Sequence, residues 1–167
     1  MSLERLNELP ADEATQEFRK CCGSQRWAET MTERRPFSSV EELTGIAGDV
    51  WRSLNHDDWL EAFRSHPKIG EKKATEPVST QSQQWSGQEQ SGMREAVANT
   101  IDSLAQLNRE YEAKFGYIFV VCATGKSAEE MLALLRERLP NDPDTELPIA
   151  AAEQAKITEL RLKKLIN

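Results

Sequence analysis

Residues 39–54 read Ser-Val-Glu-Glu-Leu-Thr-Gly-Ile-Ala-Gly-Asp-Val-Trp-Arg-Ser-Leu, and this stretch decides the fold class. Its apolar residues stand at positions 40, 43, 46, 47, 50, 51 and 54, spaced mostly by three and four. That repeat is typical of one face of an α-helix. Ser39 and Glu42 form a capping-box pattern, in which the serine accepts a free amide and the glutamate reaches back. The stretch therefore predicts an amphipathic helix with one buried face.

Six further segments on either side show the same features. Most begin at a capping residue, and all carry apolar residues at helical spacing. We expect these helices at about residues 12–22, 24–33, 55–66, 86–115, 128–139 and 146–165. Ser86-Gly-Gln-Glu89 is interpreted as the capping box that opens the longest of them. Gly116 is expected to end that helix in a left-handed conformation. Residues 67–85 are expected to form mainly a loop, with one short helical turn around residues 81–84.

The longest helix is expected to bury one apolar face. Its members step by three or four residues throughout and are Met93, Val97, Ile101, Leu104, Leu107, Tyr111 and Phe115.

Residues 117–124 (Tyr-Ile-Phe-Val-Val-Cys-Ala-Thr) are the one β-rich run in the sequence. One strand cannot make a sheet, so we expect an extended, buried connector. Its backbone polar groups then need partners outside a sheet, and a bound ligand is one candidate. The prediction is an all-α protein in which residues 1–167 form a single compact domain of about seven helices, with one buried extended segment near 117–124.

Composition restricts the class of protein further. The chain has 167 residues, of which 38% are hydrophobic, and this suits one domain with a real core. No apolar run approaches the roughly 18–20 residues of a membrane span. A net charge of −7 argues against nucleic-acid binding. The spacing of Cys21, Cys22 and Cys122 offers no disulfide framework, and neither end carries a secretory or peroxisomal signal, so we expect a cytoplasmic protein.

The stretch Arg64-Ser-His-Pro-Lys-Ile-Gly-Glu-Lys-Lys73 carries the first candidate for chemistry. Pro67 disfavours a helical conformation at His66, which should therefore lie at a helix exit. Four basic residues surround this histidine against one acid. A histidine on a stiff loop near fixed positive charge is suited to proton transfer on an anionic small molecule. The alternative is a solvated basic loop with no catalytic role.

The other candidates are Glu89, Gln90, Arg161 and the extended run, and each also has a purely structural interpretation. Glu89 suits its capping box, Gln90 suits a helix surface, and Arg161 suits the dipole of the last helix. His56 is expected to face solvent.

Several other kinds of site lack their sequence patterns. No metal is predicted, because the two histidines and three cysteines have no zinc-ligand spacing. No glycine-rich nucleotide motif and no serine-nucleophile elbow is present, so no cofactor is expected.

Taken together, six stretches resemble the 2-oxo-4-hydroxy-4-carboxy-5-ureidoimidazoline (OHCU) decarboxylase family. They occur in register across nearly the whole chain, which makes the resemblance specific although each is short. They are Cys21-Cys-Gly-Ser-Gln-Arg-Trp27, Ser65-His-Pro-Lys-Ile-Gly70, Trp85-Ser-Gly-Gln-Glu-Gln90, Phe115-Gly-Tyr-Ile-Phe-Val-Val-Cys-Ala123, Asn141-Asp-Pro and Lys156-Ile-Thr-Glu-Leu-Arg-Leu162.

The resemblance implies an all-helical, cofactor-free, usually dimeric enzyme of urate degradation, which converts OHCU to (S)-allantoin and carbon dioxide. His66 matches the catalytic proton donor, with Glu89 and Arg161 as the other catalytic residues. The positions that match substrate-binding residues are Pro67, Ser86, Gly87, Gln88, Glu89, Gln90, Ile118, Phe119, Val120, Val121 and Cys122. Two other functions remain open from the residues alone: a helical module that binds an acidic partner through the basic loop, and a metal-dependent hydrolase.

Overall fold

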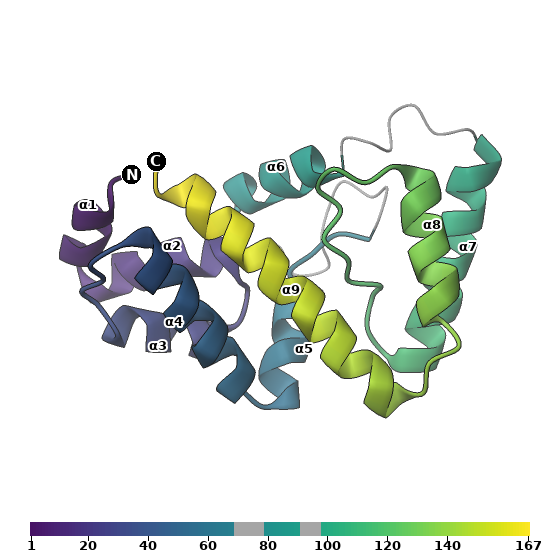
Figure 1. Cartoon of the computed structure of the whole chain (residues 1–167), viewed down its shortest axis with the longest axis horizontal. Coiled ribbons are helices and arrows are strands. Elements are labelled where there is room, and N and C mark those ends of the chain that lie inside the picture. The colour runs from purple at the N-terminus through teal and green to yellow at the C-terminus, as the bar shows by residue number, and fades with distance from the viewer. Residues whose placement is uncertain (69–78, 91–97) are drawn as a thin grey trace. The chain divides into compact units, whose positions relative to one another are not determined.

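The computed structural model describes residues 1–68, 79–90 and 98–167. These residues form nine helices and no strand, which confirms the all-α prediction (Figure 1). The helices are α1 Leu3–Glu8, α2 Ala11–Cys21, α3 Gln25–Glu33, α4 Val40–Ser53, α5 His56–Arg64, α6 Thr80–Glu89, α7 Ala98–Phe115, α8 Ala128–Arg138 and α9 Pro143–Leu165. Among the described helices, none is both long and apolar enough to cross a bilayer.

The chain divides into two compact units. The first unit contains Met1–Ala62 and Ala155–Asn167, and the second contains Phe63–Gln154. Helices α5 and α9 each begin in one unit and end in the other. The expectation of a single domain over residues 1–167 therefore stays a prediction.

The core of the first unit forms around Trp27 of α3. Its indole packs edge-on against Phe18 of α2, with ring centroids 5.9 Å apart. Its Nε1 donates to the carbonyl of Ala47 in α4 at 3.1 Å. This one side chain therefore contributes apolar burial and also satisfies its polar atom across three helices, as a buried tryptophan must.

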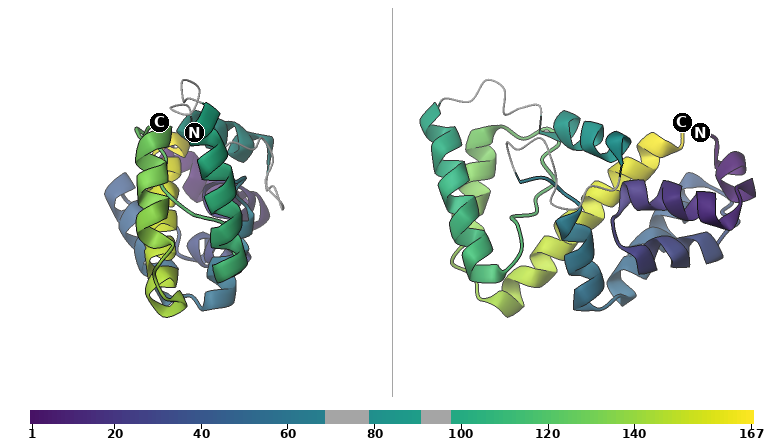
Figure 2. Two further views of the ribbon diagram at one scale, coloured as in Figure 1. Left: turned by 90° about the vertical axis from the view of Figure 1, so that its right-hand side faces the viewer. Right: turned by 180° about the vertical axis from the view of Figure 1, so that it is seen from behind.

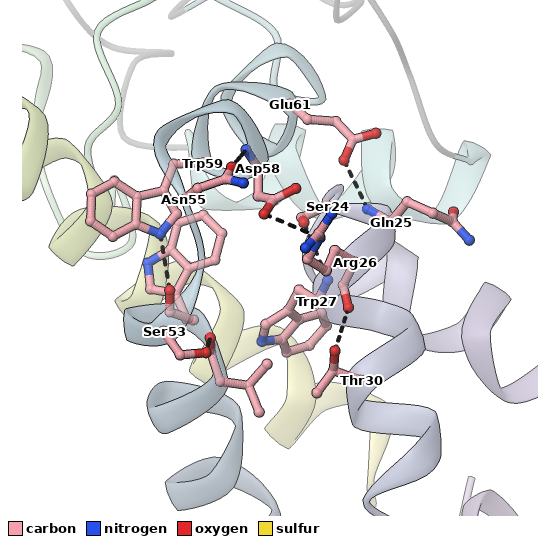
Figure 3. A network of polar contacts seen from close by, with 12 residues as sticks. Ser24, Gln25, Arg26, Trp27, Thr30, Ser53, Asn55, Asp58, Trp59 and Glu61 are labelled. Atoms are coloured by element: carbon pink, nitrogen blue, oxygen red, sulfur yellow. Dashed lines mark hydrogen bonds and ion pairs between the residues drawn. The ribbon is translucent and has the colours of Figure 1, made fainter.

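The N-terminus of α3 is held by the side chains that Figure 3 shows. Ser24 caps the helix through the amide of Trp27 at 3.3 Å. Glu61 of α5 accepts from the amide of Gln25 at 2.9 Å. A carboxylate at a helix N-terminus is stabilised both by free amides and by the helix dipole. This contact fixes α5, the helix that leads to His66, against α3.

Helices α7 and α8 lie side by side in the second unit (Figures 1 and 2). Lys114, near the C-terminus of α7, donates to the carbonyl of Leu139 just after α8 at 2.7 Å, so the two C-termini meet at one end. The chain therefore has to return along the pair between them, and residues 118–123 do so without regular secondary structure. All but Ile118 are buried in that run, which confirms the extended, buried segment.

A buried ion pair anchors this extended segment. Arg138 of α8 contacts Glu146 of α9 through Nε at 2.7 Å, and both side chains are almost fully buried. Arg138 also donates to the carbonyl of Val120 at 2.7 Å and stacks 4.5 Å over the ring of Phe119. Tyr111 of α7 donates to Glu146 at 2.5 Å. Three helices and the extended segment thus meet at one guanidinium.

The Asn141-Asp-Pro motif has a structural explanation. Asp142 accepts from the amide of Thr145 at 2.8 Å, which caps α9, and these contacts hold the pKa of its carboxyl below the usual value. Pro143 takes the first helical position, where a missing amide costs nothing. Asn141 donates to Glu146 at 3.0 Å and so completes the buried cluster.

The predicted start of the longest helix is wrong. Ser86 lies within α6, whose capping box is Ser79 with Ser82, and Glu89 is the last residue of that helix. The residues from Ser86 to Glu89 resemble a capping box, but small polar residues also occur inside a short helix that has few apolar side chains. The short helical turn expected around residues 81–84 is present within α6, which is longer than expected and runs from Thr80 to Glu89.

Two further expectations about helices differ from the structure. Ile101 of α7 is exposed, although it was predicted to face the core, while Met93 and Val97 lie outside the described residues. Nine described helices replace the predicted seven, because α1 has only six residues and α6 contains too few apolar residues to show a repeat. Gly116 has φ +82°, as predicted for the left-handed cap of α7.

We expect Arg138→Met to lower the free energy of unfolding by about 3–5 kcal/mol, because it leaves the buried charge of Glu146 without its partner. The double variant Arg138→Met with Glu146→Leu should be less destabilised, since it removes both charges. Chemical denaturation measures both. Arg136→Met, an exposed arginine on the same helix, is the control and should change stability by less than about 0.5 kcal/mol. A value for Arg138→Met as small as this control would contradict the anchoring role.

Candidate active site

His66 lies two residues beyond the end of α5, as predicted. Its amide donates to the carbonyl of Phe63 at 3.2 Å, which closes the last turn before Pro67. Both His66 and Pro67 are buried. The interpretation as a solvated loop histidine is therefore wrong. Of the predicted basic surroundings, Arg64 is exposed and Lys68 pairs with Glu112 of α7 at 3.0 Å, while Lys72 and Lys73 lie outside the described residues.

The imidazole of His66 is held by Gln154 of α9. Its Nε2 lies 2.6 Å from the Gln154 carboxamide oxygen, and Gln154 is fully buried. A carboxamide oxygen only accepts hydrogen bonds, so Nε2 carries a hydrogen in this arrangement. The ring is thus oriented by a neutral partner in the second unit.

Glu89 lies on the buried face of α6, in the second unit, which also contains His66. Ser82, Trp85, Ser86 and Glu89 are the buried residues of α6, whereas Gly87 and Gln88 are exposed and Gln90 is half-buried. The five matched positions from Ser86 to Gln90 therefore do not share one face. Ser86 lies near the C-terminal end of its helix, so it does not stand beside the free amides of a helix start.

The extended segment meets α9 at Cys122. Its amide donates to Glu153 at 3.2 Å, and its carbonyl accepts from Lys126 at 2.6 Å. Both backbone groups of Cys122 are thus engaged within the protein. Contact of these groups with a substrate stays a prediction, and so do the contacts predicted for Ile118, Phe119, Val120 and Val121.

The thiol of Cys122 is not prepared to act as a nucleophile. Burial raises its pKa, and the carboxylates of Glu153 and Glu89 raise it further. The Thr124 backbone and Lys126 oppose this shift without reversing it. A thiol with a raised pKa stays protonated near neutral pH, and the thiolate is the reactive form. Glu89 and Glu153 thus both act on the Cys122 thiol.

Arg161 belongs to the first unit and is 2% exposed. Its guanidinium donates to the carbonyl of Lys20 at 3.4 Å. Burial raises the pKa values of the Cys21 and Cys22 thiols, and the charge of Arg161 partly offsets this rise. The interpretation as a surface arginine at a helix terminus is therefore wrong. Its predicted role beside His66 stays a prediction.

A cavity of about 220 Å³ lies in the first unit between α4 and α9. Trp51, Arg52, Lys156 and Glu159 are among its lining residues. None of the predicted site residues lines it, so it adds nothing to the site around His66.

Sequence reasoning missed Glu153, Gln154 and Lys126. The first two had a recognisable signal, because they occupy the position between Ala150 and Ile157 where the apolar stripe of α9 should continue. Polar residues at a core position of a helix usually have a specific partner. No sequence signal pointed to Lys126. As for metals, the described residues contain no group of three or more His, Cys, Asp or Glu side chains that could hold an ion.

The fold and site define a helical protein in which one buried histidine is held by an amide, in a unit that also buries carboxylates and an extended backbone. A family model described as OHCU decarboxylase matches residues 7–163. The chain belongs to the OHCU decarboxylase family.

Individual relatives agree with this assignment. The uric acid degradation bifunctional protein TTL of Arabidopsis thaliana is 40% identical over 152 residues, which are 90% of this chain and 47% of that protein. The 2-oxo-4-hydroxy-4-carboxy-5-ureidoimidazoline decarboxylase of Haloferax volcanii is 28% identical, over 97% of this chain and 94% of its own. The chain spans about half or a third of the length of the bifunctional relatives that it matches.

A solved structure extends the similarity to three dimensions. It is described as the crystal structure of OHCU decarboxylase in the presence of (S)-allantoin, and it superposes with a TM-score of 0.78 at 41% identity. The match covers 90% of this chain and 96% of that one.

We expect Glu153→Leu to accelerate hydrogen exchange at the Cys122 amide by about tenfold or more, because the amide loses its acceptor and a hydrogen bond to a charged group contributes about 1.5–3 kcal/mol. Exchange followed by NMR measures the effect. Glu153→Gln keeps an acceptor and should retain most of the protection. The Leu139 amide, bonded to Leu135 in its own helix, is the internal reference and should not change. Equal protection of Cys122 in all three proteins would contradict the role of Glu153.

Proposed function

We propose that this protein decarboxylates OHCU to (S)-allantoin and carbon dioxide, with His66 as the proton donor. The observation that carries the proposal is a buried imidazole with a fixed orientation, in a unit that also buries Glu89 and the extended segment. The names of the relatives and of the similar crystal structure support the same substrate and product.

The chemistry of the substrate suits a site of this kind. Decarboxylation leaves an electron pair on carbon, and OHCU carries a C=N bond beta to the carboxylate that accepts this pair. When the carbon–carbon bond breaks, carbon dioxide leaves and the pair moves into the C=N system. The protein then has to orient the substrate, manage charge and deliver one proton.

His66 is suited to deliver that proton. The ordinary pKa of histidine, near 6.5, makes both the charged and the neutral ring available around neutral pH. The fixed ring orientation offers the proton to one face of the planar intermediate, and that selects the (S) product. General acid catalysis of this kind contributes roughly 10²–10⁴ in rate.

Glu89 and Arg161 are proposed to bind the substrate. Glu89 accepts from ureido or ring N–H groups, and burial strengthens such a bond. Arg161 offers a planar fork of donors to a carboxylate or carbonyl edge. Glu89 and Arg161 belong to different units of the chain. The proposal for Arg161 is supported by the burial of its side chain and by the resemblance of residues 156–162 to the family.

We also propose a cytoplasmic homodimer. The three cysteines are free and buried, as in a reducing compartment, and the family resemblance favours a dimer. Sedimentation equilibrium tests the dimer against a chain mass of 18.9 kDa.

We expect His66→Asn to lower kcat on freshly prepared OHCU by at least about 100-fold while the helical circular dichroism stays unchanged. His56→Asn is the matched control, because His56 is exposed and stacks on Trp59 at 5.5 Å outside the proposed site. The assay follows loss of the OHCU signal and gain of (S)-allantoin. A wild-type rate no faster than the spontaneous reaction would end the proposal, and full activity of His66→Asn would remove His66 from it.

We expect Arg161→Lys to lower kcat/KM by at least about tenfold, because lysine keeps the charge but loses the two-pronged contact. Arg136→Lys, an exposed arginine of α8, is the control and should retain activity. Initial rates over a range of OHCU concentrations measure both variants. A fully active Arg161→Lys protein with an unchanged melting temperature would show that the guanidinium fork is not needed.

A further inference from the structure

We propose that Gln154 is a positioning residue that holds His66 in the Nε2–H form, so that Nδ1 is the nitrogen that exchanges a proton with the substrate. The assignment of a substrate to Nδ1 rests on the proposed function. The assignment of the tautomer rests on the geometry alone.

The contact between the two side chains is short and buried. The 2.6 Å separation is short for a bond between a ring nitrogen and an amide oxygen, and Gln154 is fully buried. The opposite tautomer would need the Gln154 amide to turn over and present its NH2 group to a bare Nε2. With the amide oxygen facing the ring, the Nε2–H form is the neutral form that makes this hydrogen bond.

The frame that carries Gln154 is rigid. Gln154 follows Glu153 on one turn of α9, and Glu153 holds the amide of Cys122 in the extended segment. Two consecutive side chains thus fix the imidazole and the extended backbone to the same piece of helix. Because Gln154 is fixed in a helix, its hydrogen bond holds the His66 ring in one orientation through the reaction.

The neutral character of Gln154 has a chemical consequence. A carboxylate in this position would stabilise the imidazolium and make it a weaker acid. The charged groups that act on the Cys122 thiol are Glu89, Glu153 and Lys126, so two acids already lie around this part of the extended segment. An amide orients the ring without adding a third negative charge.

The proton balance follows from this arrangement. The imidazolium gives its Nδ1 proton to the carbon that has lost carbon dioxide, and the ring becomes neutral with its hydrogen on Nε2. A proton from solvent then restores the imidazolium. Gln154 keeps the same hydrogen bond in both states, so it does not have to reorganise during turnover.

The first test is NMR of the substrate-free protein with ¹⁵N-labelled histidine. The His56→Asn background leaves His66 as the one histidine of the chain. We expect nitrogen shifts of the Nε2–H form above the pKa of the ring. Gln154→Met should move them toward a mixture of tautomers, whereas Gln154→Glu should keep the Nε2–H form because it retains an acceptor. An Nδ1–H ring in the unsubstituted Gln154 protein would overturn the proposal without any variant.

The second test is the split between kcat and KM on OHCU. We expect Gln154→Met to lower kcat by about 10- to 100-fold, with KM changed less than about threefold. The kcat of Gln154→Glu should be at least about threefold higher than that of Gln154→Met, because glutamate retains an acceptor for Nε2–H. Thr158→Val is the matched control, a buried polar residue of α9 whose hydroxyl bonds the Cys22 thiol, and its kcat should not change. A normal kcat in Gln154→Met would overturn the proposal.

The two tests separate this inference from the proposed function. If the wild-type protein does not act on OHCU, the function fails while the tautomer measurement still decides the role of Gln154. If Gln154→Met does not fold, NMR of the unsubstituted protein and of Gln154→Glu still decides which tautomer His66 adopts.

Discussion

The second unit depends on one constraint, which is that a buried backbone outside a sheet must find partners for its polar groups. Residues 118–123 return along α7 and α8 without a strand to pair with. Arg138 supplies a donor for the carbonyl of Val120, and Glu153 supplies an acceptor for the amide of Cys122. Charged side chains thus supply the hydrogen-bond partners that a neighbouring strand would supply in a sheet. A buried charge needs its own partner, which explains why Arg138 is paired with Glu146.

The same constraint connects the fold to the proposed chemistry. Helix α9 begins at the Asp142 cap, supplies Glu146 to the ion pair, and about two turns later supplies Glu153 and Gln154. The register of a helix is fixed, so the residues that anchor the extended segment also determine where the imidazole is held. The buried polar residues of α9 are therefore one system, in which structural and proposed catalytic roles follow one another along a single helix.

The site also illustrates how one protein can favour acid chemistry at a histidine while keeping other groups inert. Cys122 stays protonated because burial and two carboxylates raise its pKa. Gln154 orients the imidazole without charge. His66 is thus suited to move a proton near neutral pH, which is the requirement that the proposed decarboxylation places on the protein.

The sequence by itself determined the helical class, the buried extended run and the candidate histidine, because each depends on local patterns: apolar spacing, a run of β-branched residues and a proline after His66. The local pattern failed at Ser86, where a short helix of low apolar content looked like a loop followed by a cap. Only the tertiary structure decided the partners of buried polar groups, namely Gln154 for His66, Glu153 for Cys122 and Glu146 for Arg138. Such partners come from residues distant along the chain, and no spacing rule encodes which of many polar side chains a fold will bring together.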